Sequence, residues 1–111
     1  MRLSDIKGEE VLDVLAEVIV PVTNIAMDES AAAIFKKAEL PEGENRTMFA
    51  LKRIQKNIPV LIKGHKGDLI KIMATISQQT EDEYKKGLTM ATFVKDLAEL
   101  MSDEDFLRLF T

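Results

Sequence analysis

Few side chains in this sequence could perform acid–base or metal chemistry. There is no cysteine, and the single histidine, His65, lies between Gly64 and Gly67 in a basic stretch. A catalytic or metal-binding histidine needs other ligands or proton carriers that converge on it, and only Asp68 is nearby in sequence. We therefore expect His65 to be a solvated loop residue. We expect no catalytic, cofactor-binding or metal-ligating residues, and the protein is predicted not to be an enzyme.

Asp13 and Glu17 form a carboxylate pair at i,i+4 spacing, on one face of any helix that contains them. A catalytic dyad would need a pocket that raises one pKa, whereas a salt-bridged helix edge needs only a basic neighbour. We expect the second arrangement, with Lys52, Arg53 or Lys56 as the facing residue.

Two other patterns resemble binding sites but have simpler explanations. The acidic cluster Asp103–Asp105 lacks the glycine and the spacing of an EF-hand, so it is predicted to be a helix N-terminus. The six methionines, which include Met73, Met90 and Met101, are expected in the core; the alternative is an adaptable binding groove.

The charges are arranged in blocks, although the net charge is only −4. Residues 46–71 contain seven basic and one acidic side chain, and acidic segments flank them on both sides. No aromatic residue separates the basic residues Lys52, Arg53, Lys56 and Lys63, and the overall acidity argues against a nucleic-acid binder. We expect this basic face to pair within the fold or to contact an acidic protein.

The segment Glu9–Met27 is predicted to form the central helix, because it is apolar on most sides. Its polar residues make only a narrow seam of Asp13, Glu17 and Asn24. A buried strand over Val18–Val22 is the alternative, and Pro21 predicts a kink or a restart. The apolar residues form one stripe, broadened by a second row, so we expect several partners to cover the helix at once. The stripe consists of Leu12, Leu15, Ile19, Val22 and Ala26, and the second row of Val11, Val14, Val18 and Ile25.

The middle of the chain predicts three further helices. Asp28 is expected to cap a helix over residues 29–37, and Pro41 and Gly43 mark a loop over residues 39–45. A helix over residues 46–62 follows, with Met48, Leu51, Ile54, Ile58 and Leu61 as its apolar face. Pro59 predicts either a kink or a boundary near residues 56–58. Gly64–Gly67 is expected to end this helix, and Asp68 to cap the next.

The C-terminal third contains clear capping signals. Thr80–Glu83 matches a capping box for a short turn that Gly87 closes, and Thr89 or Thr92 is expected to cap a fifth helix. A second capping signal at residues 102–105 precedes a final apolar turn with Phe106, Leu109 and Phe110. That turn is expected to dock on the core; the alternative is a contact for a partner.

Together these patterns predict an all-α protein, with residues 1–111 forming one compact domain of five or six helices around the kinked N-terminal helix. The sequence shows no secretory signal and no apolar run of about 20 residues, so we expect an intracellular protein without membrane contact.

Both ends of the chain resemble a known family. The opening residues 1–21, MRLSDIKGEEVLDVLAEVIVP, and the closing residues 83–110, EYKKGLTMATFVKDLAELMSDEDFLRLF, are similar to the small helical tail assembly chaperones of long-tailed phages and prophages of Gram-positive bacteria. The shared features are an acidic start of the first helix, a Leu88-Thr89 entry to a late helix, an acidic cap, and a terminal apolar turn.

The resemblance implies a non-enzymatic function. Such a chaperone binds and solubilises the tape-measure protein and promotes assembly of the tail tube around it, with the major tail protein as a further possible partner. It acts in the cytoplasm of the host cell and is absent from the mature virion. Many members also have a longer frameshifted form. Because coating a very long helical ligand requires many copies of a small protein, we expect a homo-oligomer, in which residues 46–71 of one copy meet an acidic surface of the next.

The residues predicted to contact a partner are Lys52, Arg53, Lys56, Lys63, Phe106, Leu109 and Phe110. The alternative function is a helix-turn-helix DNA-binding regulator from a mobile element. It requires basic side chains that reach outward from a recognition helix.

Overall fold

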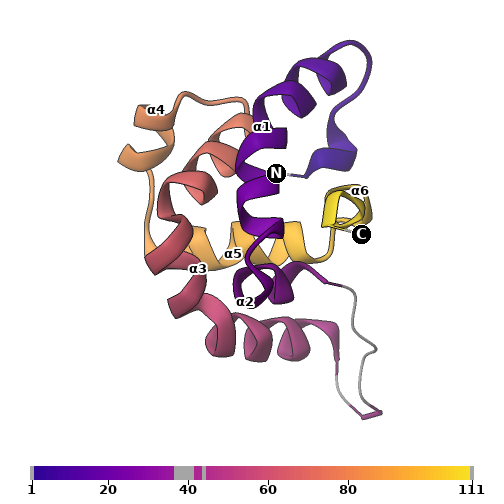
Figure 1. The fold of residues 1–111 in the computed structure, drawn as a ribbon, viewed down its shortest axis with the longest axis vertical. Coiled ribbons are helices and arrows are strands. Elements are labelled where there is room, and N and C mark those ends of the chain that lie inside the picture. The colour runs from indigo at the N-terminus through magenta and orange to yellow at the C-terminus, as the bar shows by residue number, and fades with distance from the viewer. Residues whose placement is uncertain (1, 37–41, 44, 111) are drawn as a thin grey trace.

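Helices α1 and α3 pack together and form the largest part of the computed structural model, which describes residues 2–36, 42–43 and 45–110 (Figure 1). α1 spans Glu10–Ala26 and α3 spans Arg46–Ile76. α3 also packs against α2 (Glu29–Ala32), α4 (Glu81–Lys86) and α5 (Met90–Met101). Short 3-10 turns η1 (Leu3–Asp5), η2 (Ala33–Phe35) and η3 (Arg108–Phe110) complete the fold with α6 (Glu104–Leu107).

The prediction of an all-α domain is confirmed, and the described residues contain no strand. Within them, no helix combines the length and the apolar character needed to cross a lipid bilayer. The strand alternative at Val18–Val22 is wrong, because these residues lie inside α1.

The prediction that several partners cover α1 at once is wrong, because one side of the helix is exposed. Its buried residues are Val14, Val18, Pro21, Val22 and Ile25, whereas Leu12 and Ile19 of the predicted stripe are exposed. A helix that is apolar nearly all round does not reveal by periodicity which side will be covered. α1 runs unbroken through Pro21, so the predicted restart is wrong.

Of the two breaks predicted for the third helix, the one near Pro59 is wrong, and the one at Gly64–Gly67 coincides with a bend. α3 continues through Pro59, and its one residue with non-helical backbone angles is His65 (φ −138°, ψ 27°). The predicted boundary at Gly64–Gly67 is therefore a bend within one long helix. Asp68 lies inside the helix and does not cap a new one. Of the predicted apolar face, Ile54 and Leu61 are buried, but Met48 and Leu51 are exposed.

Most of the predicted capping residues do cap helices. Backbone N–H groups donate to the side chains of Asp28 (from Ala31, 3.4 Å) and Thr89 (from Thr92, 3.1 Å), and Thr80 forms a full capping box with Glu83. α2 is shorter than predicted and ends in η2. Lys37 and most of the predicted loop lie outside the described residues.

The C-terminal turn docks on the core, as expected. Phe106 is fully buried and meets Phe35 edge-on, with ring centroids 5.3 Å apart, while Phe110 stacks on Phe35 at 4.9 Å. These aromatic contacts fix α6 and η3 against the end of η2.

Asp103 joins the two ends of the chain. Its carboxylate is 1% exposed and accepts hydrogen bonds from the Leu3 N–H (2.5 Å), the Ser4 N–H (3.4 Å) and the Ser4 hydroxyl (2.6 Å). The acidic cluster was predicted as a helix start. Asp103 does occupy the N-cap position of α6, but its side chain makes no capping hydrogen bond there and binds η1 instead.

Replacement of Asp103 is therefore expected to be costly. Asp103→Ala leaves buried donors on η1 without partners, and we expect a loss of about 3 kcal/mol in the free energy of unfolding, measured by urea denaturation. Asp105→Ala, two residues away and exposed, is the matched control and should change stability by less than about 0.5 kcal/mol. Equal losses in the two variants would contradict a special role for Asp103.

Candidate functional site

His65 lies within α3 and is largely buried, so the prediction of a solvated loop residue is wrong. Its side chain is 11% exposed and lies between two carboxylates: Nε2 is 2.9 Å from Asp28 Oδ2, and Nδ1 is 3.1 Å from Asp68 Oδ2. A neutral imidazole has one N–H, so only the charged form donates to both carboxylates. The bend of α3 is thereby joined to the cap of α2.

The two carboxylates also determine the charge of His65. Its hydrogen bond to Asp28, followed by that to Asp68, raises the pKa of His65 above its ordinary value despite partial burial. The hydrogen bond from His65 in turn lowers the pKa of Asp28. Asn24 of α1 donates to the second oxygen of Asp68 (3.2 Å), so three helical segments meet at this cluster. Among the described residues, no three His, Asp or Glu side chains are arranged to hold a metal ion.

The basic residues predicted to face a partner have different roles. Arg53 donates hydrogen bonds to the backbone carbonyls of Ala33 and Lys36, so its guanidinium caps the C-terminal end of η2. Partial burial lowers the pKa of Arg53. Lys52, Lys56 and Lys63 are exposed on α3.

The predicted salt bridge of the α1 edge exists, but with a different partner. Glu17 pairs with Lys71 at 2.8 Å, and this contact lowers the pKa of Glu17 and raises that of Lys71. The three candidates, Lys52, Arg53 and Lys56, precede the bend of α3, whereas the part of α3 beside Glu17 follows it.

The predicted partner residues of the C-terminal turn are largely used in the core. Phe106 is fully buried and cannot contact a partner in this conformation, and Leu109 and Phe110 are half-buried against the core. The residues named as partner contacts therefore do not gather into one surface.

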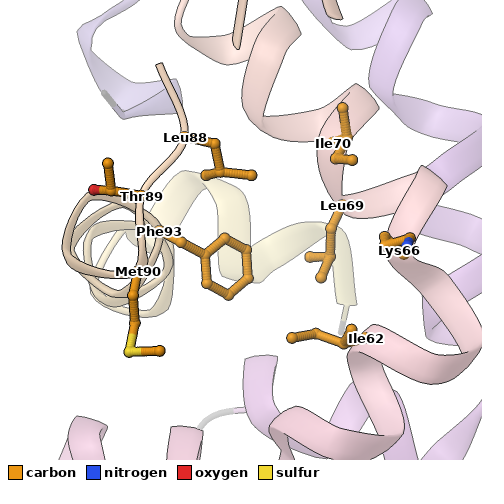
Figure 2. A pocket seen from close by; sticks show the side chains of 8 residues that line it. All are labelled: Ile62, Lys66, Leu69, Ile70, Leu88, Thr89, Met90 and Phe93. Atoms are coloured by element: carbon orange, nitrogen blue, oxygen red, sulfur yellow. The ribbon is translucent and has the colours of Figure 1, made fainter. Parts of the chain in front are cut away.

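An apolar hollow lies instead between α3 and the start of α5 (Figure 2). It has a volume of about 330 Å³, within the range of ~300–1,000 Å³ typical of concave binding sites. Leu88 and Phe93 point across it toward Ile62 and Leu69, and Met90 lies at its edge. Its lining residues are Ile62, Lys66, Leu69, Ile70, Leu88, Thr89, Met90 and Phe93.

The bend at His65 and the capping of α5 together shape this hollow. Ile62 precedes the bend and Leu69 follows it, so the angle held by His65 decides how these two residues face α5. On the other wall, the Thr89 cap starts α5 and sets the direction of Phe93. Leu69 is buried at the base, while Ile62, Leu88 and Met90 remain exposed at the rim.

Sequence reasoning missed most of this hollow. Met90 was expected in the core, with a groove as the alternative, but it is 86% exposed. Leu88 was named only as part of the entry to a late helix, and Ile62 was not singled out. The available signal was Leu88, a large apolar residue between the Gly87 terminus of α4 and the cap of α5, where a loop normally exposes its side chains.

The His65 cluster makes stability depend on pH. Because its folded pKa is raised, its contribution is complete below the unfolded pKa of 6.5 and decreases as pH rises through the folded pKa. Unfolding free energies measured by urea denaturation should fall as the pH rises from about 6.5 through the raised folded pKa of His65. His65 is the only histidine, so His65→Gln should abolish most of this slope. An equally steep slope in the variant would contradict the assignment.

Comparison of the chain with protein-family models, with curated proteins and with solved structures found no match. The hollow between α3 and α5, whose walls depend on the His65 cluster and the α5 cap, is thus the site from which a function can be inferred.

Proposed function

We propose that the protein is a tail assembly chaperone that binds apolar helical segments of a tape-measure protein and keeps them soluble during tail-tube assembly. The observation that carries the proposal is the apolar hollow between α3 and α5. Grooves between amphipathic helices are the usual receptors for a helical ligand with an apolar stripe.

The rim residues support this role. Ile62, Leu88 and Met90 stay exposed around a buried base formed by Leu69. A large apolar surface that the fold leaves uncovered is typical of a protein-interaction site. Methionine at the edge suits a binder of many related segments, because its flexible side chain repacks against different shapes.

The proposed cellular role follows from the family resemblance of the two chain ends. Leu88 and Thr89, which form part of the resembling entry to the late helix, are also lining residues of the hollow. The chaperone would act in the host cytoplasm and leave before the virion is complete. The major tail protein is a second candidate partner.

Co-expression with the large helical protein that a tail assembly chaperone is expected to have encoded next to it tests the proposal. The chain should keep that product in the soluble fraction, and Ile62→Glu should reduce the soluble amount roughly tenfold, because burial of a charge against an apolar ligand is unfavourable. Val60→Glu is the matched control: Val60 is 40% exposed on the same helix, close to the 38% of Ile62, but does not line the hollow.

Circular dichroism should confirm that both variants are folded. The proposal fails if the neighbouring product is equally soluble without this chain, or if Val60→Glu has the same effect as Ile62→Glu. A specific band in a gel-shift assay with genomic fragments would favour the regulator alternative.

A further inference from the structure

The outer side of α1 carries apolar side chains that the described part of the fold leaves uncovered. Leu12 is 68% exposed, Val20 64% and Met27 81%. These and the neighbouring exposed residues recur at three- and four-residue spacing, so they lie on one face of the helix, and none of them is charged. This α1 stripe consists of Leu12, Ala16, Ile19, Val20, Thr23 and Met27.

The spacing within the α1 stripe is that of a surface on which helices pair. Leu12, Ala16, Ile19 and Thr23 follow one another at intervals of four, three and four residues, as the core positions of a coiled coil do. Large and small side chains alternate along this row, which leaves spaces for the side chains of a second helix. The Thr23 hydroxyl donates to the Ile19 carbonyl (2.7 Å), so it keeps a partner when water is excluded.

One edge of the α1 stripe is acidic. α1 contains Glu10, Asp13 and Glu17 and no basic residue. Asp13 lies directly beside the stripe, and among the described residues none forms an ion pair with it, whereas Glu17 is paired with Lys71. A protein packed on the stripe therefore brings its own side chains next to an unpaired carboxylate.

This edge selects a partner helix of opposite charge. Two α1 stripes in contact would bring carboxylates together, which is unfavourable. The other edge, with Leu15 and Ala26, is half-buried and uncharged. The stripe is about 22 Å long, at about 1.5 Å per residue, which corresponds to about four turns of a second helix. The matching helix carries aliphatic residues at heptad spacing and lysine or arginine along one edge.

The α1 stripe is separate from the hollow between α3 and α5. Asp68 and Lys71 of α3 face α1, through Asn24 and Glu17. Lys66 lines the hollow and lies on another side of the same helix. A ligand in the hollow therefore leaves the α1 stripe open.

We propose that the α1 stripe is the docking site for an amphipathic helix of a different protein, which packs its aliphatic side chains along Leu12, Ile19 and Val20 and places a basic residue beside Asp13. The inference goes beyond the proposed function and does not rest on it, because the hollow takes no part in this contact.

Two synthetic peptides test the site by fluorescence anisotropy with the full chain. Each has about three heptads with leucine at the core positions, and the two differ only along one edge, where the first carries lysine and the second glutamate. The lysine peptide should bind at least about tenfold more tightly than the glutamate peptide. Equal affinities, or no binding of the lysine peptide, would overturn the proposal.

A matched pair of variants locates the bound peptide without changing the net charge. Ile19→Gln places an amide in the α1 stripe and should weaken binding of the lysine peptide about tenfold. Ile62→Gln makes the same change at the rim of the hollow, at a similar exposure (38% against 43%), and should bind like the wild type. Circular dichroism checks that both variants are folded. An equal loss in the two variants would place the peptide elsewhere and overturn the proposal.

Reversal of one charge tests the orientation of the docked helix. Asp13→Lys should reverse the preference, so that the glutamate peptide binds more tightly than the lysine peptide. The preference of the wild type should also weaken as salt is raised. An unchanged preference in Asp13→Lys would overturn the pairing of a basic residue with Asp13.

Sedimentation velocity of the chain alone tests a second copy as the occupant. Wild type and Ile19→Gln should sediment alike, because the α1 stripe is open in both. Self-association of the wild type that Ile19→Gln abolishes would overturn the proposal, since a second copy would then cover the stripe. Solubilisation of a tape-measure protein is measured separately, so either proposal can fail alone.

Discussion

The arrangement of the helices depends on one charged side chain held between two carboxylates. His65 interrupts the helical backbone of α3, and its ring nitrogens bind Asp28 at the start of α2 and Asp68 one turn further along α3. The angle between the two halves of α3 therefore depends on the position of Asp28, in the connection between α1 and α2. That angle also positions Ile62 relative to Leu69, so one ion-paired cluster shapes the hollow without touching it.

Local signals in the sequence were sufficient for the helix starts. A capping side chain accepts a hydrogen bond from an N–H group two or three residues further along the chain, so a short stretch of sequence is enough to predict it. The caps predicted in this way are Asp28, Thr80 and Thr89. Gly64 and Gly67 indicated the position of the bend, but not what holds it. Pro59 is the stronger local breaker, yet the helix passes through it, and the break falls at His65 because Asp28, 37 residues away, holds it there.

The binding surfaces were harder to predict than the fold, because burial is decided by the whole structure. α1 offers apolar residues on both of its broad sides, and packing on α3 covered the row with Val14 and Val18 and left Leu12 and Val20 outside. Arg53 and Phe106 were predicted to contact a partner because of their residue types and their positions in the sequence. In the structure, Arg53 binds backbone carbonyls at η2, and Phe106 is buried in the core. The hollow joins residues from both sides of the bend at His65, and the angle of that bend could not be predicted from the sequence.

The link between Asp103 and η1 also has a kinetic consequence. It joins residues 100 positions apart, so it closes nearly the longest loop that the chain can form. Contacts of such high sequence separation form after local helices, because the entropy of loop closure opposes them. We therefore expect this carboxylate to act mainly on the rate of unfolding and little on the rate of folding. Asp103 would then lengthen the lifetime of the folded protein by slowing unfolding. The capped helices would instead set the rate of folding.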